Sequence, residues 1–142
     1  MADFTLYETD WARDASRLST VRRTVFIEEQ GVPEAMEWDA HDATAIHILA
    51  LSIESTPIGC ARLLPDGRMG RMAVLSAWRG YGIGKALLAA VLRAAQVQGH
   101  SVLMLSAQTH AAGFYAAAGF EAVGTAYEEA GIAHVAMQLK LN

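Results

Sequence analysis

The sequence predicts an α/β domain in which a β-rich first half is followed by a strand, helix and strand unit. An apolar run at 45–53 and the two segments after it have the length and turn signals of a strand meander. A glycine-rich segment then separates the third strand from a helix with one apolar face. The chain has 142 residues and no repeat, low-complexity tract or linker, so we expect a single domain over residues 1–142.

The chain is expected to begin with a short strand and a long helix. Residues 4–7 alternate weakly between apolar and polar, as in a strand, and Thr9 or Asp10 can cap the helix that follows. Apolar positions then recur at helical spacing, namely Leu18, Val21 and Val25. Gly31-Val32-Pro33 ends this helix, and the polar stretch 34–44 is expected to be a loop.

The predicted meander occupies residues 45–74. Its strands are expected at 45–53, 58–64 and 68–74, with a turn at Thr56-Pro57 and a hairpin loop at 65–67. The first strand is too continuously apolar to lie half-exposed, so we expect it to be buried.

The second half is expected to alternate helices and strands. One face of the first helix is apolar, through Ile83, Leu87, Leu88, Val91, Leu92 and Ala95. Gly99 suits the left-handed stop of that helix. A short strand at 102–105, a helix at 109–118 that ends at Gly119, and strands at 120–125 and 133–141 complete the chain.

Composition excludes several classes of function. The net charge of −4 and the pI near 5.7 argue against a partner bound through a phosphate backbone, so we expect no nucleic acid. No apolar run approaches the ~20 residues of a membrane span, and the first residues do not resemble a secretory signal. We therefore expect no membrane partner and a cytoplasmic location. Cys60 is the single cysteine and is expected to be a buried apolar residue.

The glycine segment Arg79-Gly80-Tyr81-Gly82-Ile83-Gly84-Lys85 is the strongest candidate for a binding site. A helix start presents unpaired N–H groups and a partial positive charge, and glycines there let a pyrophosphate approach the backbone. Arg79 and Lys85 can add charged contacts. A Rossmann or Walker site is disfavoured by position and spacing. On these residues alone, a tight connection without a ligand stays open.

Two motifs in the expected order resemble the GNAT family of acyl-CoA N-acyltransferases. Residues 79–84 are similar to that family's Q/R-x-x-G-x-G/A signature, and residues 112–120 look like its F-Y-x-x-x-G-F segment. The resemblance runs from Phe4 to Leu141, and residues 25–33 resemble the ElaA-like branch. It implies a mixed, mostly antiparallel sheet of six to seven strands, with helices on both faces and a central splay.

The resemblance also implies acetyl-CoA as co-substrate, and roles for individual residues. Tyr115 would protonate the departing thiolate, because an ordinary phenol stays protonated at neutral pH. A core aromatic is the alternative interpretation. Ser106 and Ala107 would face the pantetheine arm. The residues expected to bind the co-substrate are Met72, Ala73, Val74, Arg79, Gly80, Tyr81, Gly82, Ile83, Gly84, Lys85, Gln108 and Phe114.

The acceptor side is less defined, because its residues carry no motif. An attacking amine must be neutral, so a base or a water chain has to take its proton. Glu29 is our candidate base, and Glu28, His110 and His134 are candidates for the acceptor pocket. Each has a structural alternative: the two glutamates as solvated surface residues, His110 as a helix-start residue, and His134 as a packed strand residue.

No metal site is expected. The five histidines are His41, His47, His100, His110 and His134, and none of them forms an H-E-x-x-H pair. Asp39 and Asp42 flank His41, but a polar loop explains this cluster equally well.

The predicted function is direct acetyl transfer from acetyl-CoA to a primary amine, either a small molecule or a protein amine. One alternative is an acyl-homoserine-lactone synthase, since residues 25–26 with Gly31, Glu37, Asp39 and Asp42 are similar to the start of those enzymes. A non-catalytic acyl-CoA sensor is the other. Family resemblance also makes a homodimer possible.

Overall fold

The computed structural model describes residues 3–141 as two antiparallel sheets flanked by helices. The first sheet contains β1 (Phe4–Thr9), β2 (Ile46–Ser52), β3 (Pro57–Leu63) and β4 (Met69–Val74), in that order. The second has the order β5 (Val102–Gln108), β7 (Ile132–Lys140) and β6 (Glu121–Glu129). The predicted α/β class and the seven expected strands are therefore confirmed within the described residues.

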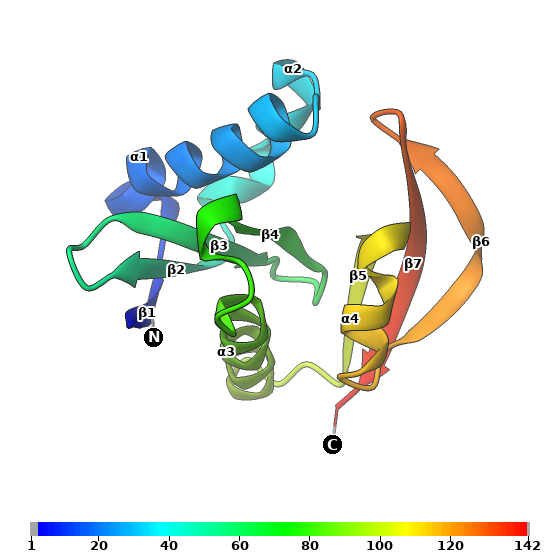
Figure 1. The fold of residues 1–142 in the computed structure, drawn as a ribbon. Helices are drawn as coiled ribbons and strands as arrows, with labels where there is room; N and C mark the ends of the chain where they lie inside the picture. Colours follow the sequence, from blue (N-terminus) through cyan, green and yellow to red (C-terminus); the bar gives the residue numbers. More distant parts are fainter. Residues whose placement is uncertain (1–2, 142) are drawn as a thin grey trace.

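The two sheets meet only at one end of β4 and β5 and diverge from there (Figure 1). Arg68 and Met104 form an isolated parallel bridge, and the Met104 N–H donates to the Gly67 carbonyl at 3.1 Å. Beyond this point, β4 and β5 are the edge strands of their sheets, and each keeps backbone groups without a strand partner. The expected central splay is confirmed.

Helices cover both faces of the first sheet, as expected (Figure 1). On one face lies α1 (Trp11–Arg22), which begins after Asp10, whose carboxylate accepts the Arg13 N–H at 2.9 Å. It continues into a π-helical segment, η1 (Arg23–Glu29). On the other face lies α3 (Ile83–Val97), and Gly99 follows it with φ +82°. Each helix buries one apolar stripe against the sheet.

The core consists of two clusters separated by the first sheet. The smaller one lies under α1 and includes Leu18, Val21 and Leu49. The larger one lies under α3, includes Leu87 and Val91, and continues into the second sheet. One apolar cluster therefore joins the two sheets.

β4 carries a bulge at the middle of the splay. The register with β3 shifts between Cys60 and Arg62, so Arg71 and Met72 together oppose Ala61. Arg71 adopts φ +46°, a left-handed conformation that is uncommon for a residue other than glycine. The bulge changes the direction of the β4 backbone at the strand edge that faces β5.

The structure corrects four predicted boundaries. The stretch 34–44 is not only loop but contains two short helices, α2 (Glu34–Glu37) and η2 (Ala40–Ala43). The helix predicted at 109–118 is instead η4 (Thr109–Ala111) followed by α4 (Ala112–Ala116). β5 extends three residues beyond the prediction, to Gln108, and β6 extends to Glu129. Another short helix, η3 (Ser76–Trp78), precedes the glycine turn. Elements this short carry too few residues to show a helical period.

Candidate active site

The glycine turn leads into α3 with its backbone open. Gly80 and Gly82 have φ values of +87° and +84°, and Gly82 is the residue before the helix. No side chain caps α3, so the N–H groups of its first turn lack intrahelical partners. A Cβ built on either glycine would meet no atom within 4 Å. The turn offers free donors and space to an anion at the positive end of the helix.

The other residues of the turn differ in exposure. Ile83 is buried in the core, whereas Tyr81 and Lys85 are exposed. A Cβ built on Gly84 would lie 3.6 Å from the Phe114 ring, so this glycine lets α3 and α4 come close. The segment therefore presents its backbone and the Lys85 ammonium to an anion, while the Ile83 side chain anchors the helix.

Arg79 is bound to Glu29 and does not extend freely into solvent. Its Nη1 and Nη2 donate to the two carboxylate oxygens of Glu29 at 2.7 and 2.8 Å, and its Nε donates to the Val74 carbonyl at 2.9 Å. The hydrogen bonds from the Arg79 guanidinium lower the pKa of Glu29. A lowered pKa makes Glu29 a weaker base than an ordinary carboxylate. The pair also connects η1 to the turn that begins α3.

A cleft of about 970 Å³ follows the splay. Residues 69–74 of β4 line one side and residues 104–108 of β5 line the other. Phe26 and Glu29 of η1 and the following Gln30 border the cleft, as do Phe114 and Tyr115 of α4. The cleft thus brings together the predicted donor residues of β4 and the residues of α4, although they are far apart in the sequence.

Tyr115 lies half-buried between two other aromatic rings. Its ring meets Phe114 and Phe120 edge to face, with centroid separations of 5.1 and 5.8 Å. Its hydroxyl donates to the Met72 Sδ at 3.7 Å, next to the β4 bulge. Burial raises the pKa of Tyr115 to about 12. The phenol therefore stays protonated at neutral pH and points toward the strand edge.

The two faces of the second sheet carry different chemistry, because side chains alternate along each strand. Leu105 pairs with Met137, and both belong to the apolar core, against which Tyr115 also packs. The pair Gln108 and His134, three positions further along the strands, lies on the opposite face. Polar cleft residues are concentrated on that opposite face.

Hydrogen bonds organise this polar face. The Gln108 Nε2 donates to the Oε1 of Gln30, the residue that follows η1, at 2.7 Å, and the hydroxyls of Ser106 and Tyr127 share a hydrogen bond. The Gln108 side chain thus contacts the end of η1, where the sequence predicted a contact with the co-substrate. This face, lined by η1, has the position expected of an acceptor pocket.

His134 is buried at the edge of the cleft, with 7% of its surface exposed. Its Nδ1 lies 2.7 Å from the Ile132 carbonyl, and its Nε2 lies 3.7 Å from a carboxylate oxygen of Glu129. The Tyr127 ring stacks on it with a centroid separation of 6.1 Å. His110 also lines the cleft, from η4, and is exposed. Glu28 is exposed and is not among the residues that line the cleft.

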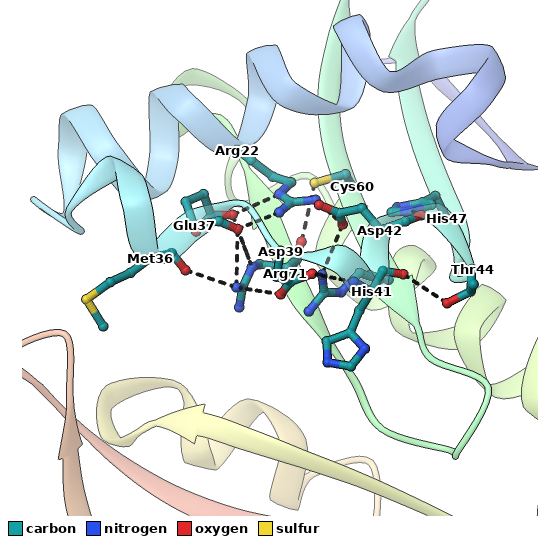
Figure 2. A network of polar contacts seen from close by, with 11 residues as sticks. Arg22, Met36, Glu37, Asp39, His41, Asp42, Thr44, His47, Cys60 and Arg71 are labelled. Atoms are coloured by element: carbon teal, nitrogen blue, oxygen red, sulfur yellow. Dashed lines mark hydrogen bonds and ion pairs between the residues drawn. The ribbon is translucent and has the colours of Figure 1, made fainter.

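A buried ion-pair network, which sequence reasoning missed, adjoins the cleft, and its members Glu37, Arg62 and Arg71 also line it. Figure 2 shows the contacts of this network. Arg22, only 1% exposed, donates to Glu37 at 2.8 Å and to Asp42 at 2.7 Å. Arg71 also pairs with Glu37, at 3.1 Å, and so connects α2 to the β4 bulge. Burial raises the pKa of Glu37, although the arginines oppose this shift.

The network also accounts for the cluster around His41. Asp39 pairs with Arg62 at 2.8 Å and with Arg71 at 3.3 Å. Asp42 pairs with Arg62 at 3.0 Å, in addition to Arg22. Among residues 3–141, no group of three or more His, Cys, Asp or Glu side chains is placed to hold a metal ion. The carboxylates of this cluster are occupied by guanidinium groups.

Two further observations concern reactivity and membrane insertion. Burial raises the pKa of the Cys60 thiol to about 12, which disfavours the nucleophilic thiolate. Over the described part of the chain, no helix has the length and apolar character needed to cross a bilayer.

Comparison with known proteins agrees with this geometry. The family model for the acetyltransferase (GNAT) domain matches residues 12–141. The uncharacterized N-acetyltransferase YjcF of Bacillus subtilis is 35% identical over 121 residues, covering 82% of this chain and 86% of YjcF.

Solved structures give the same result. An acyl-CoA N-acyltransferase from Pseudomonas aeruginosa superposes with a TM-score of 0.84 at 30% identity, covering 97% of this chain and 99% of that one. ElaA from Escherichia coli superposes with a TM-score of 0.83 at 28% identity, with the same coverage of both chains. The predicted fold and the resemblance to ElaA are confirmed. The chain is an acyl-CoA acyltransferase that belongs to the GNAT acetyltransferase family.

Proposed function

We propose that this enzyme transfers an acetyl group from acetyl-CoA to a primary amine by direct attack. The observation that carries the proposal is a single cleft that joins the uncapped start of α3, the free edge of β4 and the Tyr115 hydroxyl. The acceptor is a small-molecule amine or a protein amine. A cytoplasmic location and a homodimeric assembly both remain predictions.

The donor is proposed to bind along β4 and the turn that follows it. The N–H groups from Gly80 to Lys85 would hold the pyrophosphate, and Lys85 would add a charge. The backbone of Met72, Ala73 and Val74 would pair with the pantetheine arm as a neighbouring strand does. The Val74 carbonyl already accepts a hydrogen bond from Arg79, which leaves the groups around Met72 as the main partners.

The chemical step is proposed to need no covalent enzyme intermediate. The neutral amine nitrogen forms a bond to the thioester carbon, the C–S bond breaks, and the thiolate takes the Tyr115 proton. The nitrogen loses one proton as the amide forms, and this proton restores the Tyr115 phenol. Burial keeps that proton on Tyr115 at neutral pH. Cys60, the single cysteine, is buried outside the residues that line the cleft, which disfavours an acyl-cysteine route.

A thiol-release assay tests the proposal. Acetyl-CoA is incubated with the enzyme and with small amines, polyamines, amino-acid derivatives or lysine peptides, and products are weighed by mass spectrometry. Amine-dependent CoA release with one acetylated product per thiol is expected. Tight acetyl-CoA binding without release would favour the sensor alternative. Turnover only with acyl carrier protein and S-adenosylmethionine would favour the synthase alternative.

A further inference from the structure

Acetylation of an amine requires a base on the acceptor side of the cleft. Three carboxylates line the cleft: Glu29, Glu37 and Glu129. Glu29 is held by Arg79, which lowers its pKa, and Glu37 is buried between Arg22 and Arg71. Neither is free to accept a proton from a ligand. Glu129 is 54% exposed at its side chain and lies beside His134.

The hydrogen bond at His134 fixes which ring nitrogen is basic. A backbone carbonyl only accepts hydrogen bonds, so the Nδ1 that lies 2.7 Å from the Ile132 carbonyl must carry the ring proton. The neutral imidazole then has its lone pair on Nε2. Since this nitrogen has no hydrogen-bond partner among residues 3–141, it is available to a proton donor.

The groups that surround Nε2 come from β6 and β5. The Glu129 carboxylate, 3.7 Å away, is the charged group that faces the ring from β6, where Tyr127 also stacks on it. From β5 it faces the neutral Gln108, its partner in the strand register. The Glu129 carboxylate is therefore placed to pair with an imidazolium formed at His134.

His134 and Tyr115 belong to opposite faces of the second sheet. Tyr115 packs against the core face, whereas His134 lies on the polar face bordered by η1. An acceptor entering from the η1 side would therefore meet His134, while the departing thiolate would meet Tyr115. Tyr115, as the acid, and His134 would therefore act from opposite faces of the second sheet, and the reaction would occur at the sheet edge between them.

We propose that the His134 Nε2 is the general base and that Glu129 stabilises its protonated form. This inference rests on the proposed function. Nε2 takes one proton from the substrate ammonium and later releases it to water, and the neutral nitrogen attacks the thioester carbon. As the C–S bond breaks, Tyr115 gives its proton to the thiolate. The nitrogen then loses its second proton, and this proton restores the Tyr115 phenol.

The test compares two nucleophiles with the variant His134→Asn. Asparagine keeps an N–H donor near the Nδ1 position and removes the Nε2 lone pair. An alkylamine, which resembles lysine with its pKa near 10.4, needs a base at pH 7, whereas hydroxylamine is already largely neutral there. With the alkylamine, kcat/KM should fall by about 10²-fold or more. With hydroxylamine the loss should be only a few-fold, and acetyl-CoA affinity should not change.

Two further variants complete the test. Glu129→Gln should give a several-fold loss with the alkylamine and almost none with hydroxylamine. Glu128→Gln, at the exposed neighbouring position of β6, and His41→Asn, at an exposed histidine of η2, should behave as wild type with both nucleophiles. If His134→Asn does not fold, as judged by circular dichroism, the test rests on Glu129→Gln. A loss of kcat/KM with the alkylamine but not with hydroxylamine would then support the proposal, and equal losses would overturn it.

Other outcomes overturn the proposal. Equal losses with both nucleophiles would mean that His134 has only a structural or binding role. Full activity of His134→Asn with the alkylamine would exclude it as the base. If wild-type enzyme released CoA with neither nucleophile nor any other amine, the proposed function itself would fail. That result differs from the first two, in which wild-type enzyme is active.

Discussion

Glu29 and Arg79 stand 50 positions apart in the chain and form a bidentate ion pair, with N–O distances of 2.7 and 2.8 Å. Their side chains are 41% and 43% exposed, so the pair contributes little to stability. Its significance is positional, because it connects η1, which borders the acceptor side, to the turn proposed to bind pyrophosphate. This contact therefore links η1 to the start of the turn that precedes α3.

Replacement of Glu29 by glutamine tests whether this residue positions η1 or acts as the base. We expect KM for the amine to rise several-fold, because η1 loses its tie to the turn, while the dissociation constant of acetyl-CoA changes little. Steady-state kinetics and calorimetry measure both. Glu34→Gln, which breaks a similar exposed pair with Arg23 at 2.8 Å, is the control and should act as wild type. A kcat loss of about 10²-fold limited to protonated amines would instead make Glu29 the base.

Replacement of Tyr115 by phenylalanine should lower kcat by about 10²-fold and leave acetyl-CoA affinity unchanged. The ring contacts with Phe114 and Phe120 remain, and only the hydroxyl near Met72 is lost. Single-turnover CoA release measures the chemical step directly. Release at the wild-type rate with a good amine would exclude Tyr115 as the acid.

The pH dependence of the wild-type rate gives a second test of Tyr115. Its pKa is raised to about 12, so the phenol remains protonated throughout the range in which ordinary tyrosines, with a pKa near 10, begin to ionise. We therefore expect kcat with a neutral nucleophile to show no alkaline decline below about pH 10. A decline near pH 8 that is absent from Tyr115→Phe would contradict this assignment.

The sequence predicted best those elements whose signals are local. The α3 helix has a glycine at each end and a continuous apolar stripe, so both its extent and its buried face could be predicted. α4 was predicted too long, because the small residues Ala116 to Ala118 have no apolar period that marks its end. β6 was predicted too short, because Gly124, with φ +82°, interrupts its alternation where the register shifts.

The parts of the site that could not be predicted depend on contacts between distant residues. Arg22 meets Glu37 and Asp42 at separations of 15 and 20 positions, and no local pattern indicates such pairs. The same holds for Glu29, whose sequence context indicated a base but not its partner Arg79. The basic nitrogen of His134 likewise depends on the position of a backbone carbonyl, which only the folded chain supplies.

Substitution of Arg22 by methionine should destabilise the fold by about 3–5 kcal/mol, because the buried carboxylates of Glu37 and Asp42 both lose their most buried cation. The neighbouring variant Arg23→Met is a matched control. Arg23 pairs with Glu34 at the surface, with side-chain exposures of 43% and 59%, so its loss should cost less than about 1 kcal/mol. Urea unfolding measures both free energies. Equal stability of the two variants would show that the network of Figure 2 contributes nothing to stability.

Substitution of Gly84 by valine should block acetyl-CoA without unfolding the domain. Gly84 is not among the glycines with positive φ, so a side chain brings no backbone strain. Its Cβ would lie 3.6 Å from Phe114 and 4.0 Å from Val74, and the two added methyl groups would extend into the space proposed for the pantetheine arm. We expect the dissociation constant of acetyl-CoA to rise at least tenfold in calorimetry. Ala89→Val adds the same β-branched side chain elsewhere on α3 and controls for helix propensity. Wild-type affinity in Gly84→Val would mean that the arm does not pass beside Gly84.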